Sequence, residues 1–296
     1  MTAGWVAGAV RAKAMARRVL GAEAARQVAA SRSLPEAQRM LQSTPFRDAA
    51  EAGLSLASAQ HAVAATILWD LRVLAGWLPP DGVGLLRLLA GWFEIANVEE
   101  LLQAQAGRPA EPEFQLGALA TAWPRLSEAR SAAELRRALA ASAWGDPGGD
   151  TSRDIRLAMR ANWAARAAAS GDRARTWATT AAVVVLRSGE PPAPVATGGR
   201  ADAHGRPSVA ARLANLGRSR TSAAAAEPAT ELWQAEADWW HRVEGEGRGL
   251  LRSSATDSGP VLGAVAVMAA DARRVRAALA SAARGGRALE DYDAVV

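Results

Sequence analysis

Cysteine is absent from this chain of 296 residues, and lysine, tyrosine and phenylalanine are rare. Without cysteine the chain can form neither disulfides nor thiolate metal sites, which fits a reducing, cytosolic setting. Runs of β-branched residues are also scarce, and Val183–Val185 is the only clear one. No apolar run reaches the roughly 18–20 residues that a membrane helix needs. We therefore expect a protein that is soluble, or held at a membrane by a partner.

The residues that are abundant favour helices. Half of the chain is hydrophobic, much of it alanine, the strongest helix former, and the aromatic residues are mostly tryptophan, with eleven copies. The sequence therefore predicts an all-α fold. Lys13 is the only lysine, so almost all of the basic residues are arginine, and the net charge of +5 is modest for this length. That charge permits an acidic partner but does not by itself predict a nucleic-acid binder.

A short segment of the chain occurs twice, 98 positions apart, as residues 33–46 and 131–144. Both copies open with Ser-x-x-Glu, the capping box that satisfies free N–H groups in the first turn of a helix, and both end on an aromatic residue. A duplicated helical unit is the first hypothesis, and chance similarity in a sequence rich in alanine and arginine is the alternative. The equivalent positions are Ser33, Glu36 and Phe46 in the first copy, and Ser131, Glu134 and Trp144 in the second.

Hydrophobic periodicity predicts several long helices. Met1–Leu20 carries Val6, Val10 and Ala14 on one face, and residues 49–78 carry an apolar seam that includes His61, interpreted as a packed histidine. Further helices are predicted over residues 83–106, near 114–123, and from about Pro260 to the glycine pair at 285–286. Glu94–Leu102 and Asp271–Leu279 share a frame of acid, Val and Leu, so a second type of unit also recurs.

The sequence carries none of the motifs that we associate with catalysis. There is no Gly-Lys-Ser/Thr phosphate loop, no His-Glu-x-x-His zinc motif and no Gly-x-Ser-x-Gly nucleophile elbow. The carboxylates, such as Glu99 and Glu100, occupy helix positions that we expect to be solvated. We therefore predict no catalytic residue, no metal site, no cofactor and no enzyme activity.

The order of these pieces resembles the C/d family of central-stalk proteins in A-type and V-type ATPases. The resemblance spans nearly the whole chain, although each motif alone is short. Trp144 and Phe46 stand where the family has tyrosine, and Arg274 stands where it has asparagine. The segments that carry the resemblance are Gly4–Ala12, Ser33–Phe46, Trp92–Leu102, Gly259-Pro260 and Asp271–Arg276.

This resemblance implies a fold and a role. The family fold is one all-helical domain of three similar lobes arranged as a funnel, here expected at residues 1–112, 113–190 and 206–296, with a flexible Pro/Gly-rich loop at 188–207. The family has no catalytic activity. It links the central shaft of the rotary ATPase to the membrane proteolipid ring, on the cytoplasmic face, and so serves proton or sodium transport.

The implied partners are the proteins of the proteolipid ring and of the central shaft, with membrane contact only through the ring. Arginine-rich helix faces around Arg11, Arg72, Arg87 and Arg187 could meet these partners or could be solvated. Three alternatives stay open beside the rotor protein. They are a helical adaptor of the same fold outside any ATPase, a basic nucleic-acid binder, and an enzyme.

Overall fold

A computed structural model describes residues 3–170, 232–287 and 289–296, and these residues form α-helices and short 3₁₀ helices without any strand. The all-α prediction is therefore confirmed for this part of the chain. The helices before the undescribed segment are α1 (Ala3–Ala16), α2 (Ala22–Ala29), α3 (Leu34–Leu41), η1 (Arg47–Ala50), α4 (Leu56–Ala75), α5 (Pro80–Gln105), η2 (Gly117–Leu119), α6 (Trp123–Leu126), α7 (Ala132–Ala140) and α8 (Ser152–Ala169). Those after it are α11 (Leu232–Arg252), α12 (Ser258–Ala283) and α13 (Leu289–Val295).

The chain divides into two compact units, each described here by itself. Unit 1 joins Met1–Leu86 to Glu236–Val296, and unit 2 is Arg87–Ala235. The three lobes of the funnel stay a prediction. The predicted loop at 188–207, together with parts of the second and third lobes, lies outside the described residues.

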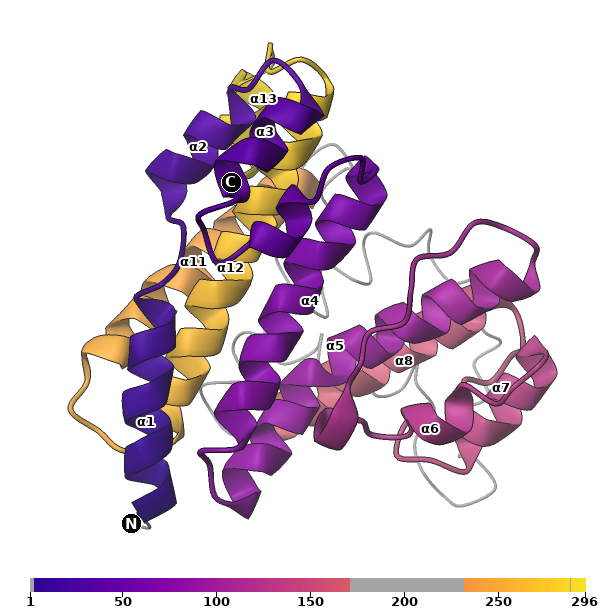
Figure 1. The fold of residues 1–296 in the computed structure, drawn as a ribbon. Coiled ribbons are helices and arrows are strands. Elements are labelled where there is room, and N and C mark those ends of the chain that lie inside the picture. The colour runs from indigo at the N-terminus through magenta and orange to yellow at the C-terminus, as the bar shows by residue number, and fades with distance from the viewer. Residues whose placement is uncertain (1–2, 171–231, 288) are drawn as a thin grey trace. The chain divides into compact units, whose positions relative to one another are not determined.

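Helix α12 is the centre of unit 1. Helices α1, α2, α3, α4 and α13 all contact it (Figure 1), and most of its residues are buried. Helix α11 also packs closely on α12, where Gly247 meets Gly263. A Cβ atom on Gly263 would lie 2.6 Å from the carbonyl oxygen of Gly247, so only glycine permits this approach.

In two helices of unit 1, the buried face differs from the apolar face that the sequence pattern picks out. Helix α4 buries Val63, Ile67 and Leu74 together with part of the predicted seam, and His61 is half-exposed. The reason is that α4 is apolar on several sides, so periodicity does not select one face. Helix α1 turns inward the face that carries Gly8, Ala9, Ala12, Met15 and Ala16, and leaves the predicted apolar face exposed.

Unit 2 is built around the part of α5 that begins at Arg87. Trp163 of α8 donates its indole N–H to the carbonyl oxygen of Leu88, at 2.9 Å, and Arg160 of α8 forms an ion pair with Glu99 at 2.6 Å. Glu99 is half-buried and paired with Arg160. The prediction that it is a solvated residue is therefore wrong. The helix predicted near 114–123 is also wrong, because this stretch forms only η2 and the start of α6.

The duplicated segments form the same local structure in the two units. Each capping serine accepts a hydrogen bond from the glutamate N–H three residues on, at 3.4 Å in α3 and 3.3 Å in α7. Each glutamate side chain accepts from the N–H of the residue before the serine, at 2.9 Å in both copies. Each segment ends on a buried aromatic residue, Phe46 or Trp144. The side-chain hydroxyl of Thr44 accepts a hydrogen bond from the backbone N–H of Phe46, and that of Ser142 accepts one from Trp144. Both turns are therefore closed in the same way.

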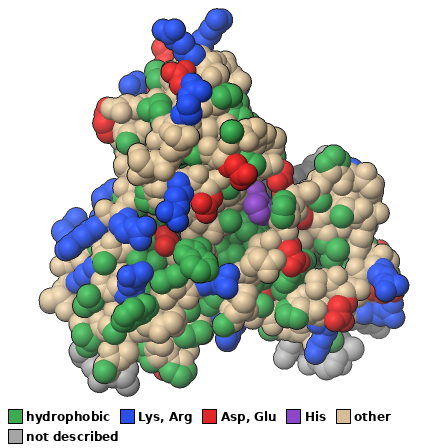
Figure 2. Space-filling view, viewed as in Figure 1, with side chains coloured by type: hydrophobic (Ala, Val, Ile, Leu, Met, Phe, Trp, Pro, Cys, Tyr) green, Lys and Arg blue, Asp and Glu red, His purple; other side chains and the backbone are tan. Residues whose placement is uncertain are grey.

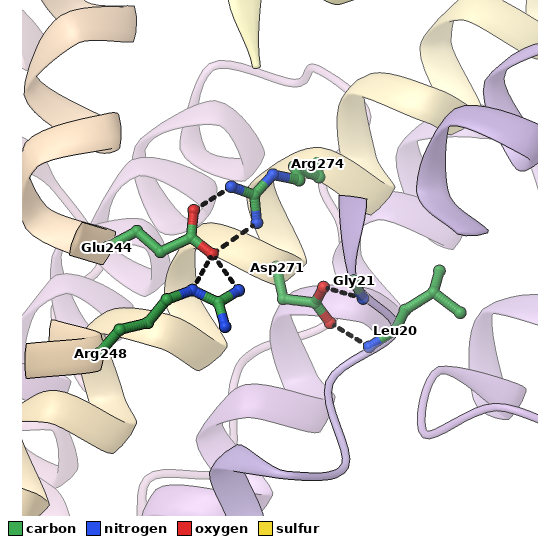
Figure 3. Close-up of polar contacts among 6 residues, drawn as sticks. All are labelled: Leu20, Gly21, Glu244, Arg248, Asp271 and Arg274. Carbon is green, nitrogen blue, oxygen red and sulfur yellow. Dashed lines mark hydrogen bonds and ion pairs between the residues drawn. The ribbon is translucent and has the colours of Figure 1, made fainter. Parts of the chain in front are cut away.

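In both units, a buried acid on a long helix caps the start of a short helix. In unit 1, Asp271 of α12 accepts the N–H groups of Leu20 and Gly21 at 2.7 and 2.8 Å, just before α2 (Figure 3). In unit 2, Glu94 of α5 accepts two consecutive N–H groups just before α6, at 2.6 and 2.8 Å. Each carboxylate thus satisfies N–H groups at a helix start, where the helix dipole also favours negative charge. Burial raises the pKa of Asp271, and the N–H groups of Gly21 and Leu20 oppose this rise.

The residue three positions after each acid has a different partner in the two units. Asn97 bonds both the N–H and the carbonyl of the buried Phe114, at 2.7 and 2.9 Å, and so holds the loop around Phe114 to α5. Arg274 instead forms a buried ion pair with Glu244 of α11, and Arg248 bonds the same carboxylate (Figure 3). Burial tends to raise the pKa of Glu244, but the hydrogen bonds from the two arginines outweigh it and lower that pKa overall. An arginine at position 274 is therefore matched by an acid on the neighbouring helix.

Candidate functional site

The four arginines singled out in the sequence have different surroundings. Arg11 and Arg72 lie on α1 and α4 of unit 1, and each stacks on an exposed tryptophan. Arg87 lies in unit 2, where its guanidinium donates to the carbonyl oxygen of Ala118 at 3.1 and 3.2 Å and so holds the loop at η2. Arg187 lies outside the described residues. The candidate site is therefore the surface around the first two.

Helix α1 exposes two apolar side chains. Val6 and Val10 are 43% and 63% exposed, while the glycine and alanine face of the same helix is buried. Small residues let α1 approach its neighbours closely, and Gly8 lies directly against Leu78. A helix that only needed a hydrophobic contact with its own core would bury the valines. Their exposure therefore indicates a second surface on the other side of α1.

Two tryptophans of the same unit are also exposed. Trp69 of α4 and Trp77, just after α4, are 59% and 51% exposed. The guanidinium carbon of Arg11 lies 5.9 Å from the ring centroid of Trp77, and that of Arg72 lies 5.4 Å from that of Trp69. Such cation–π contacts are worth about 0.5–1 kcal/mol at exposed sites, so they favour arginine conformers that lie over the rings.

We name the two exposed tryptophans and the two arginines over them the arginine–tryptophan surface: Arg11, Trp69, Arg72 and Trp77. Figure 2 shows hydrophobic and basic side chains gathered over the region of α1 and α4. Two of the three exposed tryptophans in the described part of the chain belong to this surface. Tryptophan and arginine are also the residue types that contribute most to binding energy at protein interfaces. The composition is therefore that of an interaction surface.

The charge of this surface is positive. Neither Arg11 nor Arg72 forms an ion pair with any residue that the structure describes, and the same holds for Arg18, which acts on Asp70 as Arg11 does. Burial raises the pKa of Asp70. The positive charges of Arg18 and Arg11 lie close enough to Asp70 to lower the pKa of its carboxyl group, but they counteract that rise only in part. Two or more guanidinium groups are thus available to an acidic partner, which favours an interface with complementary negative charge.

Other types of site find little support in the described residues. No group of three or more His, Asp or Glu side chains is placed there to hold a metal ion. Across the same residues, no helix combines the length and the apolar character needed to span a membrane. No protein-family model and no curated protein matches the chain. The family resemblance therefore stays a prediction that rests on the sequence motifs.

The tryptophans of the surface were missed as site residues at the level of sequence. A signal was present, because Trp69 and Trp77 each lie one position away from the predicted seam of residues 49–78. A large aromatic residue beside an apolar seam, with an arginine three residues further on in the case of Trp69, is a pattern that could have identified this surface.

Proposed function

We propose that the protein is a non-catalytic component of the central stalk of an A/V-type rotary ATPase, which couples the central shaft to the membrane proteolipid ring in proton or sodium transport. In this proposal the arginine–tryptophan surface binds an acidic surface of a ring or shaft protein. The protein then acts at the cytoplasmic face of the membrane and contacts the membrane only through the ring.

The observation that carries the proposal is the surface itself. Arg11 and Arg72, the residues expected to meet the partners, each lie over an exposed tryptophan. A protein that transmits torque needs contacts that resist displacement. Aromatic anchors that become buried on binding, surrounded by charge pairs, provide such contacts, whereas isolated surface ion pairs contribute little. The sequence motifs, which occur in the same order as in the family, indicate which proteins the partners are. The arginines and tryptophans of the surface indicate that the contact surface of the partner is acidic.

The test is recovery of partners from the native host with a tagged protein. The wild type should bring down the ring and shaft proteins in stoichiometric amounts. A double variant, Trp69→Ala with Trp77→Ala, should lose them, because it removes both anchors. Trp92→Ala is the matched control, since Trp92 is a tryptophan of unit 2 that is 42% exposed. It should retain the partners.

The outcomes separate the proposal from its alternatives. Recovery of other proteins in place of every ATPase component, with the same loss in the double variant, would identify a helical adaptor of the same fold. Recovery of nucleic acid that falls steeply with salt would identify a nucleic-acid binder. Equal loss of partners in the control and in the double variant would show that the arginine–tryptophan surface is not the interface.

A further inference from the structure

A concave basic pocket lies at one end of unit 1, where the C-terminus of α12 meets the N-terminus of α3. Its volume is about 810 Å³, within the range of ligand pockets in proteins. Arg32, Arg284 and Arg287 line it together with Ser33 and the start of α3, and its described lining residues include no aspartate or glutamate. The pocket and the arginine–tryptophan surface have no residue in common.

The backbone of the pocket is fixed by a helix-ending motif. Gly285 donates its N–H to Ala282 at 2.9 Å and Gly286 donates to Ser281 at 3.1 Å, the two hydrogen bonds of a Schellman motif. Both glycines have positive φ, 89° and 63°. A Cβ on Gly286 would come within 2.8 Å of the Ala30 carbonyl oxygen. The chain is therefore held close to the end of α2, with one arginine on each side of the glycine pair.

The three guanidinium groups are available for a ligand. In the part of the chain that the structure describes, none of them takes part in an ion pair or a side-chain hydrogen bond. The acid closest in sequence to Arg32, Glu36, accepts the backbone N–H of Arg32 and caps α3. Arg284 at the end of α12 also complements the helix dipole. That role does not account for Arg32 and Arg287, which lie in the same pocket.

We propose that this pocket binds an anion with clustered phosphate groups. Arginine presents a planar fork of N–H donors that matches phosphate oxygens two at a time, which lysine cannot do. Three such forks in one concavity, without a lining carboxylate, concentrate positive potential in a space large enough for several phosphates. The phosphates could belong to a free polyphosphate or to a phospholipid headgroup, because the chemistry of recognition is the same. This proposal does not depend on the ATPase role.

The experiment measures binding of tripolyphosphate by calorimetry, and of equimolar phosphatidylcholine and phosphatidic acid vesicles by flotation. The double variant Arg284→Gln with Arg287→Gln should weaken binding by about tenfold or more per arginine, the worth of a hydrogen bond to a charged group. The control variant, Arg39→Gln with Arg47→Gln, removes the same charge from exposed positions of unit 1 outside the pocket. It should bind like the wild type.

Each outcome bears on the proposal. Selective loss with tripolyphosphate identifies a free anion as the ligand, and selective loss with vesicles alone identifies a lipid headgroup. Changing Arg284 and Arg287 to lysine should restore only part of the affinity, because the charge returns without the fork. Equal weakening in the control variant, or no wild-type binding to either probe, overturns the proposal. Urea unfolding of all variants checks that they remain folded.

Discussion

The hydrogen bond between Trp144 and Glu94 should be one of the strongest single contributions to unit 2. The indole Nε1 donates to the Glu94 carboxylate at 2.7 Å, and the Glu94 side chain is fully buried. The same carboxylate accepts the backbone N–H groups of Thr121 and Ala122. Trp144→Phe removes one of the three donors but keeps an aromatic ring. Unit 1 has phenylalanine at the equivalent position, so the change is compatible with this type of turn.

The expected loss of stability can be worked out from these contacts. Removal of a hydrogen bond to a buried charged group costs about 1.5–3 kcal/mol. The smaller ring leaves a cavity that adds roughly 1 kcal/mol. We therefore expect Trp144→Phe to lower the free energy of unfolding of unit 2 by about 3 kcal/mol. Hydrogen exchange at Thr121 and Ala122 gives a local measurement of that free energy, since Glu94 holds both amides.

A double-mutant cycle separates the hydrogen bond from the packing. In the background of Glu94→Leu, the acceptor is absent and Trp144→Phe should cost little more than its cavity. The two changes should therefore be coupled by about 2 kcal/mol. A coupling of less than about 0.5 kcal/mol would refute the reasoning, because the indole would then act through its size alone.

Two further predictions concern unit 1 and the repeated caps. Because burial raises the pKa of Asp271, the folded state holds its proton more tightly than the unfolded chain does. The stability of the wild type relative to Asp271→Asn should therefore fall as the pH rises from about 3.9 towards the higher folded pKa, and stay constant above it. Urea unfolding across this pH range measures the slope, and a rise with pH would contradict the prediction. Ser33→Ala and Ser131→Ala should each cost about 1 kcal/mol, and glycine at either position only a few tenths. Thermal unfolding of the four variants tests this, and a loss confined to one copy would show that the caps are not equivalent.

Local features of this fold could be predicted from the sequence because their signals lie within a few residues. A capping box places donor and acceptor three residues apart, so Ser33 and Ser131 identified two helix starts directly. The glycine stop after α12 is equally local, since Gly285 has the positive φ that ends a helix. The all-α class follows from the helix propensity of the residues that are abundant.

Contacts between distant segments could not be predicted in this way. Asp271 caps a helix start that lies 250 residues earlier in the chain, and nothing near Gly21 in the sequence indicates an acid from α12. The orientation of α1 was also not predictable from hydrophobicity. Its glycine and alanine face is less apolar than the face with Val6 and Val10, but it fits closer to the neighbouring helices. Packing distance decided the orientation, and single-sequence periodicity does not contain it.

The candidate site was predictable in part. The arginines Arg11 and Arg72 were named from their helix faces, whereas the tryptophans beneath them were assigned no role. The basic pocket could not be found, because Arg32 and Arg287 are separated by most of the chain and meet only where α12 ends against α3.

Unit 1 is built from the two ends of the chain, and this has a consequence for its synthesis on the ribosome. Helices α1 to α4 are made first, but the helix on which they all pack, α12, is made about 180 residues later. At a typical 5–20 residues per second these helices wait for roughly 10 seconds or more with their core faces uncovered. The described helices of unit 2, by contrast, are complete before α12 begins. We therefore expect unit 2 to fold first, and nascent chains arrested before α12 to be bound by chaperones through their N-terminal helices.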